Sequence, residues 1–436
     1  MNRHLLTKER PNMRVLIVST SDKTGGAAVA AYRLMEALNN NGVKARMLVR
    51  QKDTDNISVE ELGNGLMGKR HFLWERLVIY LNRKFNRDHL FEIDIANSGT
   101  DITKSKAFRD ADVIHLHWIN QGMLSLRDIR KILDSGKPVV WTMHDIWPAT
   151  AICHYSNGCY RYKGQCKECK LLPGGGGEND LAAKVWRRKQ AMLNGHTVSY
   201  VACSKWLAAE AKQSALLTGQ HITATPNDID THVFRPIDKS EARKAFNLPE
   251  GKKIIMFCAQ KVTDKRKGMD YLAEALDRMV KQQPALKNEA AVAVMGGRAE
   301  EIASLLPLPV MPLGYIADDR QIVEAYNAAD VFVLPSVEDN LPNTIMEAMA
   351  CGVPCVGFKT GGIPEMIDHQ KNGYVATCRD AESLAQGILW TLQHAEEANL
   401  AAQAVRKVVT TYSQTAVALR YIEVYNQALA FKHYSI

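Results

Sequence analysis

The sequence predicts two α/β domains, each a doubly wound parallel sheet. The chain has 436 residues, which exceeds the ~250 to 300 residues at which one hydrophobic core usually stops growing. Apolar runs of strand length alternate with segments of helical period along most of the chain, and this alternation indicates parallel strands joined by helical crossovers. Two domains of similar size are therefore expected, facing each other across a cleft.

Five apolar runs define the strands of the first domain, which we place at residues 13–233 after an N-terminal extension, 1–12. These runs are RVLIVST (14–20), VKARMLV (43–49), DVIHLHW (112–118), PVVWTMH (138–144) and VSYVACS (198–204).

A second series of runs predicts the other domain, at residues 251–412, after a linker rich in Pro, Asp and charge at 234–250. Its strands are expected at KIIMFCA (253–259), AVAVMGG (291–297), PVMPLGY (309–315), DVFVLPS (330–336), PCVGF (354–358) and GYVA (373–376). The last segment, 413–436, has a helical pattern that we expect to cross back to the first domain near Tyr421 and Tyr425. Ligands of such sheets bind beyond the carboxyl ends of the strands, so the cleft is the expected site.

The overall composition narrows the class of partner. The net charge is +8, which favours an anionic ligand, but no RNA-binding, zinc-finger or basic-zipper pattern accompanies it, so nucleic acid is not expected. No apolar run of about 20 residues occurs, and charges interrupt the N-terminus where a signal peptide would be apolar. A cytoplasmic location is therefore expected.

The most informative segment is PSVEDNLPNTIMEAMACGVP, residues 335–354, where a strand ends in an acidic, Asn-rich loop before a helix. Asn343 or Thr344 is suited to cap that helix, and its free backbone N–H groups suit phosphate oxygens. Glu347 is suited to accept hydrogen bonds from the two hydroxyls of a ribose. The loop thus predicts half of a nucleotide site, and an ordinary capped helix is the alternative.

A basic loop in the same domain supports the nucleotide interpretation. Lys265, Arg266 and Lys267 precede Gly268 at the start of another helix, after the strand at 253–259. Flexible cations there are suited to a diphosphate, and glycine permits close approach. A solvated basic loop is the alternative.

On these residues the chain resembles the family 4 glycosyltransferases of the two-domain GT-B fold, from Arg14 to about Ile422. The run LGYIADDRQIVEAYNAADVFVLPSVEDNLPNTIMEAMACGVPCVGFKTGGIPEMI is the most specific element. The family places an acidic residue and a glutamate eight positions apart, and Asp339 and Glu347 have this spacing. Asn340, Leu341 and Pro342 stand where the family has Gly-Phe-Gly.

The resemblance also assigns roles to other residues. Lys267 matches the lysine that neutralises the donor diphosphate, and the family's arginine position falls on Gln260 or Lys261, so Lys261 or Arg266 supplies the second charge. Gly25 and Gly26 form a turn that brings backbone N–H groups near the donor phosphates or the acceptor. The family places a histidine matching His144 against the donor sugar, so sugar positioning is expected of it. The predicted catalytic set is His144, Asp339 and Lys267, and the predicted donor-binding set is Gly25, Gly26, Lys261, Arg266, Lys267, Asn340, Leu341, Asn343, Thr344 and Glu347.

The resemblance implies a retaining hexosyltransferase that requires no metal for catalysis. Such an enzyme moves a sugar from a UDP- or GDP-sugar to a glycan or lipid-linked acceptor, in cell-surface polysaccharide or lipopolysaccharide assembly. Two alternatives stay open at the level of the sequence. One is a nucleotide-sugar epimerase of the same fold, and the other is a non-catalytic, zinc-bearing protein that binds an anionic ligand.

Two further segments carry separate predictions. CHYSNGCYRYKGQCKEC holds Cys153, Cys159, Cys166 and Cys169, which match a structural zinc site in ligand number and type, with free thiols as the alternative. The segment 68–91 mixes Phe, Leu, Trp and Tyr with Lys and Arg at helical spacing. It predicts either a basic amphipathic helix that contacts the inner face of the membrane or a helix packed on its domain with a solvated basic face.

Overall fold

The computed structural model describes residues 13–63 and 65–434, so the predicted extension 1–12 lies outside the described residues. The chain divides into two compact units. The first contains the chain up to Cys203, Leu207–Thr225 and the chain from Val417, and the second contains Ser204–Trp206 and Pro226–Ala416.

The first unit is built on a seven-stranded sheet with the order β3-β2-β1-β4-β5-β6-β7, in which all neighbouring strands are parallel. Its strands are β1 (Arg14–Ser21), β2 (Lys44–Gln51), β3 (Val59–Glu61), β4 (Val113–Leu116), β5 (Val139–Met143), β6 (Ser199–Ala202) and β7 (His221–Ala224).

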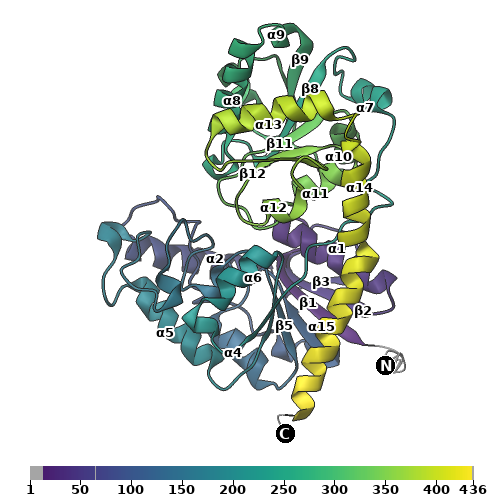
Figure 1. Ribbon diagram of the computed structural model, residues 1–436. Helices are drawn as coiled ribbons and strands as arrows, with labels where there is room; N and C mark the ends of the chain where they lie inside the picture. Colours follow the sequence, from purple (N-terminus) through teal and green to yellow (C-terminus); the bar gives the residue numbers. More distant parts are fainter. Residues whose placement is uncertain (1–12, 64, 435–436) are drawn as a thin grey trace. The chain divides into compact units, whose positions relative to one another are not determined.

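Helices of the first unit connect and cover these strands (Figure 1). They are α1 (Gly26–Asn40), α2 (Gly65–Asn82), α3 (Lys106–Asp110), α4 (Leu126–Asp134), α5 (Leu181–Leu193), α6 (Lys205–Lys212) and α15 (Gln414–Tyr434), of which α6 and α15 begin in the second unit. Short 3₁₀ turns lie at η1 (Ile102–Lys104), η2 (Trp147–Ala149), η3 (Arg161–Lys163), η4 (Pro173–Gly175) and η5 (Ala215–Leu217).

The second unit has a six-stranded parallel sheet with the order β10-β9-β8-β11-β12-β13. Its strands are β8 (Lys253–Lys261), β9 (Ala290–Gly297), β10 (Val310–Gly314), β11 (Val331–Leu334), β12 (Cys355–Phe358) and β13 (Gly373–Ala376). Its helices are α7 (Lys239–Ala245), η6 (Lys265–Lys267), α8 (Met269–Gln282), α9 (Leu286–Glu289), η7 (Ala299–Leu305), α10 (Asp319–Asn327), α11 (Asn343–Ala350), α12 (Ile363–Met366), α13 (Ala381–His394) and α14 (Leu400–Thr411).

The predicted fold class is confirmed, since every strand expected from an apolar run is present and both sheets are parallel. The sequence reasoning missed β3 and β7, the two edge strands of the first sheet. Both are short, and most of their side chains are exposed or half-buried. An edge strand with little buried surface leaves no apolar run in the sequence.

The predicted return of the C-terminal helix to the first domain is also confirmed. Val417, Ala418, Tyr421, Tyr425 and Ala428 of α15 belong to the core cluster that includes α1 and the first sheet. The hydroxyl of Tyr425 hydrogen-bonds His115 Nδ1 at 2.8 Å, and that of Tyr421 hydrogen-bonds Thr142 Oγ1 at 2.9 Å. The last helix is thus part of the core of the first unit.

Candidate functional site

In the second unit, polar groups gather where β8 and β11 end. The loop after β11 carries Asp339, and the 3₁₀ turn after β8 carries Arg266 and Lys267. Lys267 Nζ donates to Asp339 Oδ2 at 2.6 Å, and an Arg266 Nη lies 3.6 Å from the same oxygen. Burial alone would raise the pKa of Asp339, but Lys267 and Arg266 outweigh it and hold the pKa below its usual value.

The two loops are joined by close backbone contacts. Val337 N donates to Arg266 O at 2.9 Å. Gly268 has a φ of +77°, and a Cβ there would lie 1.9 Å from the carbonyl oxygen of Pro335. Only glycine therefore allows the basic turn to approach the acidic loop this closely.

Glu347 lies on the buried side of α11 and is 8% exposed. Its Oε2 accepts a hydrogen bond from the hydroxyl of Tyr326 at 3.1 Å. Burial, and next the charge of Glu347, raise the pKa of the Cys258 thiol on β8 to about 12, while Lys267 acts on the same thiol in the opposite sense. The glutamate and the cation are thus both within electrostatic reach of one side chain at the end of β8.

The start of α11 differs from the prediction that Asn343 or Thr344 caps it. The N-cap residue is Pro342, and no side chain caps the helix. Asn343 instead accepts a hydrogen bond from Asn227 Nδ2 at 2.9 Å, and the buried Thr344 hydroxyl has no hydrogen-bond partner among the described residues. Proline fixes φ near −65°, here −67°, which is compatible with the start of a helix, and its side chain has no hydrogen-bond acceptor. The first N–H groups of α11 are therefore without side-chain caps.

The other residues predicted for this half of the site occupy different positions. Asn340 is buried and accepts a hydrogen bond from Ser204 Oγ at 2.5 Å, and Leu341 is buried beside it. Lys261 is exposed at the end of β8, where it pairs with Gly297 of β9. Of the described ion pairs around Asp339, those with Arg266 and Lys267 are present and none involves Lys261.

In the first unit, Gly25 and Gly26 form the expected turn between β1 and α1. Gly25 is the N-cap, has a φ of +95°, and no side chain caps the helix. Next to this turn, the Asp22 carboxylate accepts hydrogen bonds from Asp53 N at 2.8 Å and Thr54 Oγ1 at 2.6 Å. The turn is therefore anchored to the chain that follows β2.

His144 follows β5 and belongs to a group of buried and half-buried neutral side chains. Its Nε2 lies 2.9 Å from His117 Nδ1, and its Nδ1 lies 3.5 Å from Cys203 Sγ. Burial lowers the pKa of His144 to about 4, with a smaller opposing effect from Asp145. At neutral pH His144 is therefore uncharged. One of its ring nitrogens then carries a proton and can donate a hydrogen bond, while the other can accept one.

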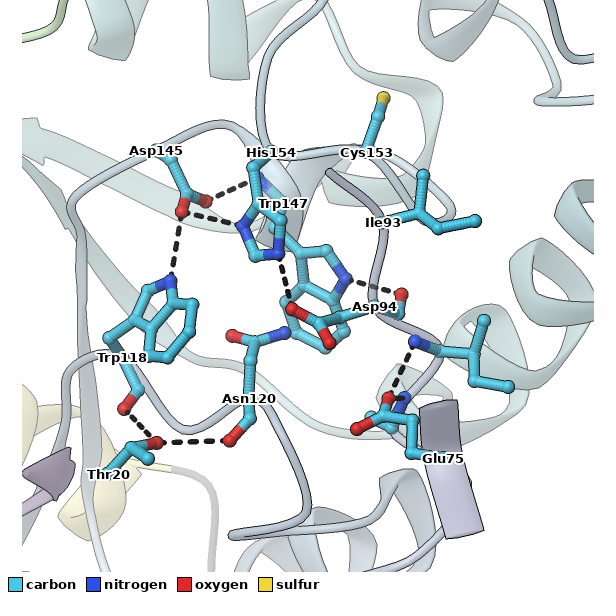
Figure 2. A network of polar contacts seen from close by, with 12 residues as sticks. Thr20, Glu75, Ile93, Asp94, Trp118, Asn120, Asp145, Trp147, Cys153 and His154 are labelled. Atoms are coloured by element: carbon cyan, nitrogen blue, oxygen red, sulfur yellow. Dashed lines mark hydrogen bonds and ion pairs between the residues drawn. The ribbon is translucent and has the colours of Figure 1, made fainter. Parts of the chain in front are cut away.

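The residue after His144 belongs to a charged network (Figure 2). Asp145 Oδ2 lies 2.7 Å from His154 Nδ1, and His154 Nε2 lies 2.6 Å from Asp94 Oδ2. Trp118 Nε1 also donates to Asp145, at 3.1 Å. Burial by itself would lower the pKa of His154, but Asp145 and Asp94 outweigh it and raise the pKa to about 10. His154 is thus a buried imidazolium held between two carboxylates.

Sequence reasoning did not single out His117, Asp94 or His154. His117 could have been found from the sequence, because it lies near the carboxyl end of an expected strand, in the run DVIHLHW, where site residues gather. Asp94 and His154 lie in irregular segments, 60 residues apart, and had no periodic signal.

The zinc site at the four cysteines stays a prediction. Among the described residues, no group of three or more His, Cys, Asp and Glu side chains is arranged to hold a metal ion. The cysteine segment is anchored separately at its two ends, because Cys153 pairs with Ile93 and Cys169 N donates to Asp180 at 2.8 Å. Burial raises the pKa of the Cys153 and Cys166 thiols to about 12. The other three cysteines each raise the pKa of Cys153 further, so the four thiols lie within electrostatic reach of one another.

Both units are similar to known proteins. The family description "Glycosyltransferase Family 4" matches residues 24–233, and "Glycosyl transferases group 1" matches residues 252–394. A D-inositol 3-phosphate glycosyltransferase of Thermobispora bispora is 26% identical over 229 residues, which are 50% of this chain and 53% of that protein. The chain thus spans about half the length of the curated relatives it matches.

Solved structures show the same fold over nearly the whole chain. Sucrose-phosphate synthase from Thermosynechococcus elongatus has a TM-score of 0.65 at 18% identity, covering 96% of this chain and 99% of its own. HepE of Anabaena, solved with UDP, has a TM-score of 0.61 at 16% identity, covering 95% of this chain and 100% of its own.

Two parallel doubly wound units with polar groups at their strand ends define a GT-B glycosyltransferase fold. The chain belongs to the group 1 glycosyltransferases, family 4.

Proposed function

We propose that the protein is a retaining, metal-independent glycosyltransferase that moves a sugar from a UDP- or GDP-sugar to a hydroxyl of a glycan or lipid-linked acceptor. The observation that carries the proposal is the cluster at the ends of β8 and β11. There Lys267, Arg266, the uncapped start of α11 and the buried Glu347 lie in one unit. Their combination suits a ribose and a diphosphate.

Each group in this cluster matches one part of the donor. The two cations and the N–H groups at the start of α11 suit the diphosphate, because a helix N-terminus carries a partial positive charge and unsatisfied donors. Glu347 suits the ribose hydroxyls, since its carboxylate has acceptor capacity beyond the hydrogen bond from Tyr326. Asp339, paired with Lys267, is proposed to contact the donor sugar.

The chemical step separates an anomeric carbon from a diphosphate, so negative charge grows on the leaving oxygens. Fixed donors aimed at that charge stabilise the transition state, and one such donor is worth about 3 kcal/mol. Lys267 is the proposed catalytic cation, since the Asp339 carboxylate holds its ammonium group in place at the strand ends. His144 is proposed to position the sugar, a role that suits a ring kept neutral by a lowered pKa.

The descriptions of similar structures support a proposal for the donor and the kind of acceptor. Structures of HepE contain UDP and UDP-glucose, and WaaG is described as a glycosyltransferase involved in lipopolysaccharide biosynthesis. We propose by analogy that a UDP-sugar is the donor and that the acceptor belongs to cell-surface polysaccharide assembly at the inner face of the membrane.

Calorimetric titration with UDP and GDP tests the donor site. We expect Glu347→Ala and Lys267→Ala each to weaken binding of the preferred nucleotide by about 10-fold or more, because each removes a charged hydrogen-bonding partner. Lys265→Ala is the matched control, since Lys265 lies on the same turn but is exposed. The nucleotide affinity of this variant should equal that of the wild type. Unchanged affinity in both test variants would refute the site.

Product analysis then separates the transferase from its rivals. A transferase releases nucleoside diphosphate only with an acceptor present, whereas an epimerase converts the nucleotide sugar alone. A non-catalytic binding protein would release no nucleotide, and Glu347→Ala would not change its binding.

A further inference from the structure

Helix α2 (Gly65–Asn82) buries charged side chains and exposes apolar ones, which is the opposite of an ordinary surface helix. Its buried residues include the charged pair Glu75 and Arg76. Glu75 Oε1 accepts hydrogen bonds from Ile95 N at 2.8 Å and Ala96 N at 2.7 Å, and Arg76 pairs with the buried Asp94. Polar contacts therefore anchor the helix to its unit.

The opposite face of α2 carries large apolar side chains in water. Their positions follow helical spacings of three, four and seven residues, so they form one stripe along the helix. Each is between 45% and 66% exposed, and they are Leu66, Met67, Leu73, Trp74, Leu77 and Leu81. The stripe is extended by Phe85, which is 65% exposed just beyond the end of the helix. Contiguous exposed apolar surface of this kind marks an interaction site.

The exposed charges on α2 itself are all positive, while the exposed acids Glu61 and Asp88 lie just outside the segment 65–87. Lys69, Arg70, Lys84 and Arg87 are exposed, and the only acidic residue between positions 65 and 87 is the buried Glu75. Arg70 lies within the stripe, three residues before Leu73 and four after Leu66. An apolar stripe that carries cations, and no exposed acid on its own helix, is complementary to an anionic, apolar surface.

We propose that the apolar stripe of α2 docks on a bilayer surface rich in anionic phospholipids. Tryptophan and leucine side chains would enter the headgroup region, and the four cations would contact lipid phosphates. Within the described residues, no helix is long and apolar enough to cross a bilayer. The sequence left open whether this helix packs its apolar face on the domain, and the exposure of the stripe contradicts that alternative.

A second copy of the chain is the other occupant to consider. A symmetric pair of stripes would bring the cations of both copies, Lys69 and Arg70 among them, into one interface, without an exposed acid on α2 to offset the like charges. A lipid surface offers phosphates to each cation instead. The bilayer is therefore the occupant that the charges favour.

Co-sedimentation of the full chain with phosphatidylcholine vesicles, with and without phosphatidylglycerol, tests the proposal. We expect binding to the anionic vesicles and little to the neutral ones. Leu73→Gln with Leu77→Gln should weaken binding by about 10-fold or more, through lost apolar burial. Lys69→Gln with Arg70→Gln should weaken it by roughly fivefold for each charge removed.

Leu419→Gln is the matched control, because Leu419 is 58% exposed on a different helix, and its vesicle binding should equal the wild type. All these side chains point to solvent, so the melting temperatures of the variants should stay close to that of the wild type. Failure of the wild type to bind anionic vesicles, or equal binding by the leucine double variant, would overturn the proposal. So would a dimer in size-exclusion chromatography that the leucine variant dissociates while vesicle binding is absent.

Discussion

At the scale of single residues, two histidines ten positions apart have opposite acid–base behaviour. His144 touches His117 and Cys203, and its pKa is lowered to about 4 by burial. His154 is also buried, but it lies between Asp94 and Asp145, and its pKa is raised to about 10. The nearest partners, not the burial that both share, decide the charge.

We predict that His154→Gln lowers the free energy of unfolding by about 3 to 5 kcal/mol near pH 6, because it leaves two buried carboxylates without their cation. The pKa of His154 is raised above its ordinary value of 6.5, so its contribution is complete below pH 6.5 and is lost as pH rises through about 10. The wild type and the variant should therefore approach each other in stability at alkaline pH. Urea unfolding at pH 6, 8 and 10 measures this.

His232→Gln is the control for that series, since His232 is exposed, and its stability should follow the wild type at every pH. A constant difference between wild type and His154→Gln from pH 6 to 10 would show that the imidazolium does not carry the effect.

At the scale of elements, the cluster that we propose binds the donor depends on two loops that touch at a glycine. We predict that Gly268→Ala destabilises the protein by about 1 to 2 kcal/mol from the left-handed backbone and by about 1 to 3 kcal/mol more from overpacking. The second part arises because the new Cβ would lie 1.9 Å from the carbonyl oxygen of Pro335. Nucleotide affinity should fall as well, since the basic turn must move away from Asp339.

Gly42→Ala separates the two effects. Gly42 has a φ of +84°, but no atom lies within 4 Å of its ideal Cβ position. This variant should show only the backbone cost and normal nucleotide affinity. If both glycine variants were equally destabilised by thermal unfolding, contact with Pro335 would not explain the result.

At the scale of the whole molecule, the chain leaves the first unit at Thr225 and returns to it at Val417. The core of the first unit is therefore completed by the last helix. We predict that Tyr425→Ala lowers the free energy of unfolding by about 3 to 5 kcal/mol, as for other large core aromatics. Tyr425→Phe should cost about 1 kcal/mol, for the lost hydrogen bond with His115.

Leu419→Ala is the control on the same helix, because Leu419 is exposed and its truncation should change stability by less than about 0.5 kcal/mol. Denaturant unfolding followed by tryptophan fluorescence compares the three variants. A Tyr425→Ala protein as stable as the wild type would mean that α15 does not contribute to the core of the first unit.

The sequence alone determined the fold class and the parts of the proposed donor-binding cluster that are local in the chain. Strands with two buried faces leave continuous apolar runs, so the central strands were predictable, while the exposed edge strands β3 and β7 were not. Lys267, Asp339 and Glu347 were predictable because each follows a buried strand or lies on the helix after it, and the carboxyl ends of parallel strands meet at one edge.

Only the tertiary structure decided how distant or irregular segments pair. His154 and Asp94 are 60 residues apart, and neither lies in a periodic segment. The cysteine segment is likewise joined through Cys153 to Ile93, which lies in a distant part of the sequence. The pattern of α2 revealed an amphipathic helix, and a buried partner for Arg76 then decided which face turns inward. Periodicity in a sequence shows which residues share a face of a helix or strand. Which segment that face packs against depends on contacts between residues far apart in the chain, and no local pattern encodes them.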